Sequence, residues 1–230
     1  MRGGVPPDGR QNGTVTSPRP ATVVFLHGIG VGPESWDAQV RALPDGFAGV
    51  APRIAGLRDH DGVPFTLDGA VSALCDELDR RGLERVHVCG LSLGALVATR
   101  LAATRPERVA SLVLSGGQVR PHPVLMRVQN GILRLLPARI AGAPGMSKGR
   151  MLDVLRALAA LDLRPELSRI GARTLVLCGA RDRANIPAAR ELAASIPHAS
   201  LQIVPGAGHE WNTQLPHEFS SRLNAFLASA

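Results

Sequence analysis

The fold follows from the stretch RVHVCGLSLGALVATRLAAT, residues 85–104. Its beginning, residues 85–90, is a short apolar run of the kind that forms a buried strand, and residues 95–104 continue as a helix. Between them lies GLSLG, in which Ser92 has a glycine two positions before it and another two positions after it. A sharp strand-to-helix turn holds such a serine beside a helix N-terminus, where backbone N–H groups stabilise negative charge. Because the glycines let strand and helix approach closely, the stretch predicts a nucleophilic serine.

Strands and helices alternate on both sides of this turn. Predicted strands cover residues 21–26, 47–52, 85–90, 109–117, 174–180 and 201–205, and predicted helices cover residues 36–43, 66–81, 95–104, 188–196 and 216–230. The strands are nearly continuous apolar runs separated by helical stretches, which is typical of a parallel sheet with helices on both faces. The predicted fold class is therefore α/β, with a mostly parallel sheet of about six strands.

Two segments interrupt this order. The first is residues 1–20, rich in Gly, Pro and Arg and without the apolar core of a signal peptide, which we expect to be a disordered tail. The second is residues 118–165, where apolar helical pieces flank a Gly/Pro-rich joint, PARIAGAPG. A helical excursion between two core strands predicts a small inserted cap. We therefore expect one domain, residues 21–230, that carries this cap.

The composition limits the partners of the protein. The formal net charge is +7, but the arginines that carry it are scattered, and aromatic residues make up only 3%, with no tyrosine. We expect no nucleic-acid partner, because base binding needs a basic patch with stacking aromatics. No apolar run reaches the roughly 18 residues of a membrane span, so we expect no membrane association and a cytoplasmic location.

The cysteines and histidines predict neither a disulfide framework nor a metal centre. The chain has an odd number of cysteines, Cys75, Cys89 and Cys178, and two of them lie in apolar strand-like runs. No Cys/His cluster has the spacing of metal ligands, so we expect neither a metal nor a cofactor. The oligomeric state does not follow from the sequence.

The chain resembles the α/β-hydrolase superfamily over residues 21–230, on the motif GLSLG and on FLHGIG, residues 25–30. The resemblance implies that the loop after the first predicted strand donates one amide of an oxyanion hole. The hole would then consist of the N–H groups of Ile29 and Leu93, with Gly30 as the competing first donor. By the same resemblance, His27 would hold this loop in place and take no part in the chemistry.

In that superfamily the acid and then the histidine follow the nucleophile along the chain. The stretch TLVLCGARDRANIP, residues 174–187, resembles the G-x-x-D acid turn and indicates Asp182. A surface carboxylate paired with a neighbouring arginine is the competing interpretation. LQIVPGAGHEWN, residues 201–212, places His209 in a Gly-rich loop after the last strand. The resemblance thus implies a serine hydrolase in which Ser92 attacks a carbonyl, His209 removes its proton and Asp182 orients His209.

Two features depart from the superfamily. Only the Gly/Pro-rich segment precedes the first predicted strand, where the family often has an antiparallel hairpin, so we expect a shortened sheet. The loop PRIAGLRDHDG, residues 52–62, lacks the acidic, glycine-paced turn common after the second strand. The shape of that side of the site therefore stays open.

Apolar side chains near these motifs are candidates for a pocket that binds a small-molecule acyl substrate. The candidates are Trp36, Leu93, Met126, Leu133, Leu136, Met146, Met151 and Trp211. For each of them, a place in the core is the competing interpretation. A cap of about fifty residues favours modest substrates, namely small or medium acyl esters, thioesters or lactones.

Two other functions stay open at this point. A C–C bond hydrolase or a lyase would use the same three residues, and a basic pocket containing Arg127 or Arg134 would favour anionic substrates of that kind. A non-catalytic ligand-binding receptor would keep the fold without the reaction, because a fold alone does not determine function.

Overall fold

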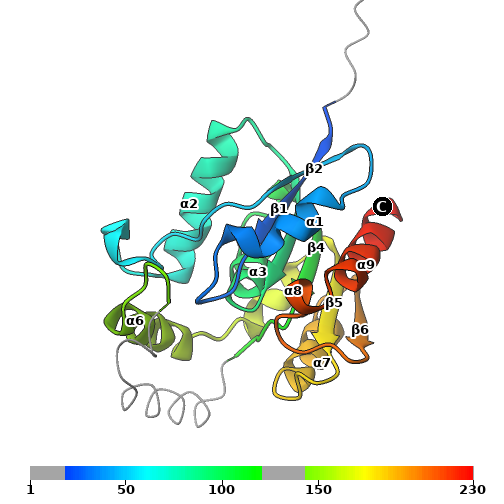
Figure 1. Ribbon diagram of the computed structural model, residues 1–230. Helices are drawn as coiled ribbons and strands as arrows, with labels where there is room; N and C mark the ends of the chain where they lie inside the picture. Colours follow the sequence, from blue (N-terminus) through cyan, green and yellow to red (C-terminus); the bar gives the residue numbers. More distant parts are fainter. Residues whose placement is uncertain (1–18, 121–142, 230) are drawn as a thin grey trace, which may run out of the picture.

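The computed structural model describes residues 19–120 and 143–229. A single six-stranded sheet forms its centre, with the strand order β2-β1-β3-β4-β5-β6 (Figure 1). The strands are β1 (Ala21–Leu26), β2 (Phe47–Val50), β3 (Val86–Leu91), β4 (Val109–Ser115), β5 (Arg173–Gly179) and β6 (Ala199–Val204). All neighbouring strands pair in parallel. The predicted α/β class and the six-stranded parallel sheet are confirmed.

Helices connect the strands. They are α1 (Asp37–Arg41), α2 (Leu67–Arg80), α3 (Leu93–Thr104), α6 (Lys148–Ala159), α7 (Ile186–Ser195), α8 (Trp211–Gln214) and α9 (Pro216–Ala228). Short 3-10 turns, η1 (Pro33–Trp36), η2 (Asp59–Asp61), η3 (Pro106–Arg108) and η4 (Arg164–Arg169), complete the connections. Each helix expected from the sequence is present, with bounds that differ by a few residues. The short helix α8 is an addition that the sequence pattern did not predict.

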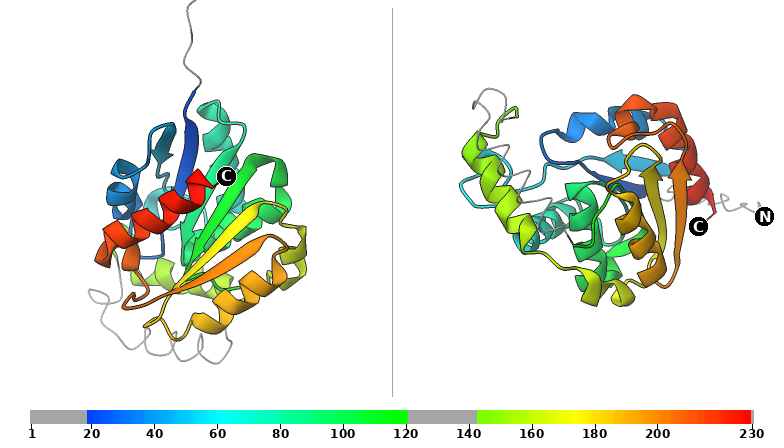
Figure 2. Two further views of the ribbon diagram at one scale, coloured as in Figure 1. Left: turned by 90° about the vertical axis from the view of Figure 1, so that its right-hand side faces the viewer. Right: turned by 90° about the horizontal axis from the view of Figure 1, so that it is seen from below.

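The helices cover both faces of the sheet (Figure 2). Buried side chains of α2, α3, α6 and α7 form one core cluster, and those of η1, α8 and α9 form a second. Strand β4 shows how the sheet supplies both clusters, because successive side chains of a strand point to opposite faces. Leu112 and Leu114 belong to the first cluster, and Val113 belongs to the second.

The strand order places a crevice at one end of the sheet. From β1 the chain moves outward to β2 and then returns to β3 on the other side of β1. In parallel sheets, ligands bind outside the carboxyl ends of the strands where the order reverses in this way. The loop after β1 and the turn after β3 meet at that point, and they carry the FLHGIG and GLSLG motifs.

The two segments outside the predicted core are only partly described. Residues 1–18 of the expected tail and residues 121–142 of the expected cap lie outside the described residues. Arg19, which the sequence places in the tail, donates hydrogen bonds of 2.9 Å to the carbonyl oxygens of Arg81 and Gly82. No helix in the described part of the chain is both long and apolar enough to cross a membrane.

Helix α6 is the described helical part of the expected cap. Its side chains Val154, Leu155 and Leu158 are buried in the first core cluster. Before α6, the Ser147 N–H and hydroxyl donate to the carboxylate of Asp59 at 2.8 and 2.7 Å. The loop of residues 52–62, unusual in sequence, is thereby tied to the start of α6.

Candidate active site

Ser92 lies at the turn from β3 into α3 with a backbone conformation that L-residues rarely adopt. Its φ and ψ angles are 54° and −113°, and it is the one non-glycine residue with positive φ in the described part of the chain. Such a conformation costs about 1–3 kcal/mol and persists only where the surroundings enforce it. The backbone at Ser92 is therefore strained.

The two glycines of GLSLG are required by close packing. A Cβ atom at Gly94 would overlap the carbonyl oxygen of Leu26 in β1, and one at Gly90 would overlap the carbonyl oxygen of Gly94. The strand and the helix therefore approach as closely as the sequence motif predicts.

Backbone hydrogen bonds fix the Ser92 peptide in place. Its N–H donates to the carbonyl oxygen of Ser115 at 2.9 Å, and its own carbonyl oxygen accepts from Ala95 at 3.0 Å. Leu93 is the first residue of α3, and the first N–H groups of a helix have no acceptor within the helix. The Leu93 amide is therefore one of the N–H groups at the start of α3 that have no acceptor within the helix.

Asp182 and His209 come from the loops after β5 and β6. The His209 Nδ1 atom donates to the Asp182 Oδ2 atom at 2.7 Å. The two loops lie close together because Gly179 has no side chain, and a Cβ there would overlap the Gly208 carbonyl oxygen. With Nδ1 bound to Asp182, the Nε2 atom of His209 is the nitrogen available to accept a proton.

Asn185 is a further polar partner in this group, and the sequence reasoning did not identify it. Its side-chain Nδ2 donates to both carboxylate oxygens of Asp182 at 2.9 Å. Nδ2 also lies 3.2 Å from the Nδ1 of His209, because both nitrogens converge on Oδ2. Asn185 follows Asp182 in one turn, in which the Asn185 N–H donates to the Asp182 carbonyl oxygen at 3.0 Å.

The electrostatics favour a charged Asp182 and a basic His209. Burial alone would raise the pKa of Asp182, but hydrogen bonds from His209 and Asn185 outweigh this effect and lower it. The hydrogen bond to Asp182 raises the pKa of His209 above its ordinary value of 6.5, against the opposing effect of burial, and the Glu210 carboxylate adds to the rise.

Ser92 and His209 line one cavity of about 370 Å³. Its apolar wall consists of Ile29, Leu91, Leu93, Leu96, Leu155 and Leu158. Its other polar side chains are Gln118, Asn185 and Glu210. Gly116, with a φ of 58°, also lines it, and a Cβ there would lie 3.0 Å from the Cε1 of His209. An apolar cavity with a few convergent polar groups is the usual form of a small-molecule site.

The loop after β1 separates this cavity from a smaller one of about 50 Å³. Ile29 lines the cavity beside Ser92, whereas Gly30 lines the smaller one. His27 is buried, and its ring nitrogens contact the Gly28 carbonyl oxygen at 2.8 Å and the Ile54 N–H at 3.3 Å. It therefore holds the loop.

Two of the predicted pocket residues are in the core instead. Trp36 and Trp211 are fully buried in the second core cluster, where their rings lie 5.3 and 4.5 Å from that of Phe219. They pack on the face of the sheet covered by α9, and neither lines the cavity beside Ser92. Placing them in the pocket was wrong, because closeness in sequence to a site motif does not say which face a side chain takes.

The remaining pocket predictions have mixed outcomes. Leu93 lines the cavity, while Met146 lines the smaller neighbouring one and Met151 packs against the first core cluster. The candidates Met126, Leu133 and Leu136, and the basic candidates Arg127 and Arg134, lie outside the described residues. In residues 19–120 and 143–229, no group of three or more His, Cys, Asp or Glu side chains could hold a metal ion.

A parallel sheet with a strained serine turn and an adjoining His–Asp pair is the architecture of hydrolytic enzymes. The chain belongs to the alpha/beta hydrolase family, whose sequence profile matches residues 23–222. It is 28% identical to the "Putative carbamate hydrolase RutD" of Caulobacter sp. (strain K31), over 90% of each chain. It is 30% identical to a 2-hydroxy-6-oxononadienedioate/2-hydroxy-6-oxononatrienedioate hydrolase of Pseudomonas putida, over 85% of this chain and 84% of the other.

The fold of this chain is similar to that of solved crystal structures. The crystal structure of an enol-lactonase from Burkholderia xenovorans LB400 superposes with a TM-score of 0.80 at 23% identity, over 91% of this chain and 92% of that one.

Proposed function

We propose that the protein is a serine hydrolase that cleaves a small or medium acyl ester, thioester or lactone. The observation that carries the proposal is the strained Ser92 turn, which faces the same cavity as the hydrogen-bonded His209–Asp182 pair. A serine is a weak nucleophile until a base removes its proton, and a histidine oriented by a carboxylate is the usual base.

The proposed reaction has two steps. His209 Nε2 takes the proton of the Ser92 hydroxyl as its oxygen attacks the substrate carbonyl, and Asp182 stabilises the imidazolium that forms. His209 returns the proton to the leaving group, which departs and leaves an acyl-serine. Water, deprotonated by the same imidazole, then attacks the acyl carbon and releases the acid. The raised pKa of His209 suits it to both proton transfers.

The oxyanion formed in each step needs donors. We propose the N–H groups of Leu93, at the start of α3, and Ile29, on the cavity side of the loop after β1. Preorganised donors of this kind typically contribute about 10²- to 10³-fold in kcat each.

The size of the substrate is proposed from the cavity. A volume of about 370 Å³ with a largely leucine-lined wall suits a small or medium acyl group. The carbamate named for the Caulobacter relative is also a carbonyl compound with a heteroatom leaving group, which agrees with cleavage next to a carbonyl.

A second candidate function is hydrolysis of a C–C bond. It is favoured by the name of the Pseudomonas putida relative, which covers most of both chains. The same serine, histidine and aspartate would serve, with a carbanion in place of an alkoxide as leaving group. The substrate would then carry a ketone next to the bond that breaks.

The test is a chain-length series of nitrophenyl esters, together with fluorophosphonate labelling of the reactive serine, on the wild type and on Ser92→Ala. We expect labelling and turnover in the wild type and a loss of at least about 10⁴-fold in kcat in the variant. Labelling without ester turnover would favour the C–C hydrolase. Folded wild-type protein that shows neither labelling nor turnover would overturn the hydrolase proposal and leave a ligand-binding receptor.

A further inference from the structure

Gln118 is a polar side chain in the wall of the proposed active-site cavity that the proposed reaction does not use. It follows β4 and the two glycines Gly116 and Gly117, and it lines the same cavity as Ser92 and His209. The surrounding wall is largely aliphatic, so each of its few polar side chains has a strong influence on which ligands bind.

The orientation of this amide follows from its neighbours. The Asp182 carboxylate, ionised because its pKa is lowered, can only accept hydrogen bonds, so Asn185 must turn its Nδ2 toward it. The Oδ1 of Asn185 then points the other way and accepts a hydrogen bond of 2.8 Å from the Nε2 of Gln118. The Asp182 carboxylate thus fixes the orientation of the Asn185 amide, and the Asn185 amide fixes the orientation of the Gln118 amide.

The nitrogen end of Gln118 is thus committed to Asn185, which is itself buried with 6% of its surface exposed. The carbonyl oxygen, Oε1, accepts no hydrogen bond from a side chain or backbone group in residues 19–120 and 143–229, and the Gln118 side chain lines the cavity. An amide oxygen has two lone pairs, and leaving it without a partner when a ligand displaces water costs binding free energy.

We infer that Gln118 determines specificity, with its Oε1 accepting a hydrogen bond from an O–H or N–H group of the substrate. This inference rests on the proposed function, because it concerns what the same cavity selects. The preferred substrate class is therefore a carbonyl compound with a hydroxyl or amide donor, in preference to a purely aliphatic ester of the same shape. A site that binds a donor discriminates against the isostere that lacks it, since the acceptor is then left unpaired.

The test compares pairs of esters that differ only in the donor. On the acyl side the pair is N-acetylglycine methyl ester and methyl 4-oxopentanoate, in which CH₂ replaces the N–H. On the alcohol side the pair is 2-hydroxyethyl butyrate and propyl butyrate. Binding is measured by ligand-observed NMR titration of Ser92→Ala, which holds the esters without the attacking hydroxyl, and of the double variant Ser92→Ala/Gln118→Met.

We expect the donor-bearing member of at least one pair to bind Ser92→Ala about 3- to 10-fold more tightly, as one neutral hydrogen bond contributes. In the double variant this ratio falls to about one-fold. A Gln118 that merely supports Asn185 would weaken both members equally and leave the ratio unchanged. Equal binding of both members in Ser92→Ala, a ratio that survives Gln118→Met, or no binding of any ester overturns the inference.

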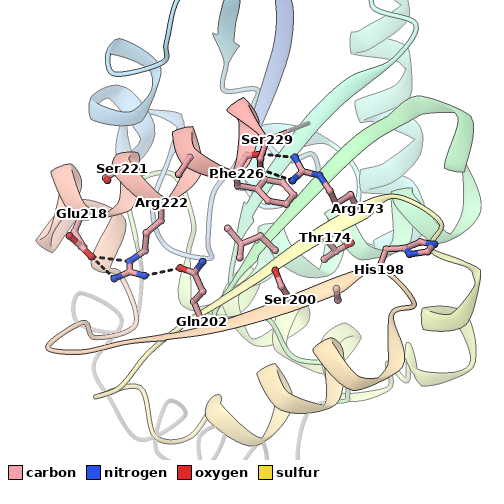
Figure 3. Close-up of a pocket in the computed structure, with 13 residues that line it drawn as sticks. Arg173, Thr174, His198, Ser200, Gln202, Glu218, Ser221, Arg222, Phe226 and Ser229 are labelled. Atoms are coloured by element: carbon pink, nitrogen blue, oxygen red, sulfur yellow. Dashed lines mark hydrogen bonds and ion pairs between the residues drawn. The ribbon is translucent and has the colours of Figure 1, made fainter.

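The matched control is Gln202→Met in the Ser92→Ala background. Gln202 lies in β6, where its Oε1 accepts from the Nη1 of Arg222 at 2.7 Å (Figure 3). It is not among the residues that line the cavity beside Ser92. We expect this control to keep the binding ratio. Turnover of the same esters by the wild type is measured separately. A binding ratio that depends on Gln118 without any turnover or labelling would reject the hydrolase and keep the specificity role.

Discussion

Two hollows on the surface of the molecule differ in how their polar side chains are hydrogen-bonded. The larger, of about 690 Å³, lies between β6 and α9 and is rich in charged side chains (Figure 3). There Arg222 donates to Glu218 and Gln202 at 2.5–2.9 Å, and the Arg173 guanidinium donates to Ser229 at 2.9 Å and lies over the Phe226 ring. In this hollow, called the groove below, both arginine side chains are therefore bound by neighbouring side chains.

The smaller cavity beside Ser92 is different. Its walls are mostly aliphatic, yet His209 and Gln118 each have one polar atom bound by a neighbour and a second polar atom that no group in residues 19–120 and 143–229 binds. Nδ1 of His209 is bound to Asp182 while Nε2 is available, and Nε2 of Gln118 is bound to Asn185 while Oε1 is available. The two hollows therefore differ in how many of their polar atoms are already hydrogen-bonded, as well as in volume and charge.

The largest expected effect contrasts the carboxylates of the two hollows. Asp182→Asn should lower kcat about 10³- to 10⁴-fold, because an amide stabilises the wrong tautomer of His209 and no longer stabilises the imidazolium. Glu218→Gln in the groove should leave kcat within about 2-fold, since it faces no reacting atom. Ester turnover at saturating substrate measures both. Similar losses in the two variants would show that the difference between the hollows is not catalytic.

The second effect concerns backbone packing. Gly94→Ala should lower the free energy of unfolding by about 3 kcal/mol or more, because the new Cβ would overlap the Leu26 carbonyl oxygen. Gly171→Ala, two residues before β5, should change it by no more than about 1 kcal/mol, because nothing lies within 4 Å of the added Cβ. Urea denaturation compares the two. A Gly94→Ala protein as stable as the wild type would contradict the close approach of β1 and α3.

The third effect is a shift in pH dependence. His209 acts as a base only when neutral, so kcat/KM should rise with pH through the raised pKa of His209, above 6.5. Glu210→Gln removes a carboxylate that raises this pKa, so the acidic limb should move to lower pH. Glu218→Gln serves as the control and should leave the limb in place. Because Glu210 is exposed, added salt should reduce the shift, and a limb that moves to higher pH would contradict the assignment.

The smallest effect is expected in the groove. Arg222→Gln should change the free energy of unfolding by less than about 1 kcal/mol, because the side chains of Arg222 and Glu218 are 29% and 48% exposed and their attraction is screened. Thermal melting and ester turnover together check this. A tenfold loss of kcat/KM in Arg222→Gln, with stability retained, would mean that the groove takes part in function.

Much of the fold could be predicted from local patterns. The apolar runs and the helical stretches between them predicted the order of elements, and the two glycines around Ser92 predicted a sharp turn that the structure contains. The meeting of Asp182 and His209 agrees with the order implied by the family resemblance. Their roles in catalysis remain proposals that the variants above test.

Other features could not be read from the sequence. Trp211 lies two residues after His209, yet α8 turns it to the opposite face of the sheet, where its Nε1 donates to the Ser115 hydroxyl at 3.0 Å. Asn185 and Gln118 gave no motif of their own. The one local signal was the position of Asn185 three residues after Asp182, within reach of its carboxylate through a turn.

The sequence by itself determined the class of fold, the strained serine turn and the chain order of the candidate residues, because periodicity and glycine positions act over a few neighbouring residues. Only the tertiary structure decided which side chains line the cavity and which are in the core. The physical reason is that the loops after β3, β4, β5 and β6 come from distant parts of the chain. They meet only because the sheet places the carboxyl ends of those strands side by side.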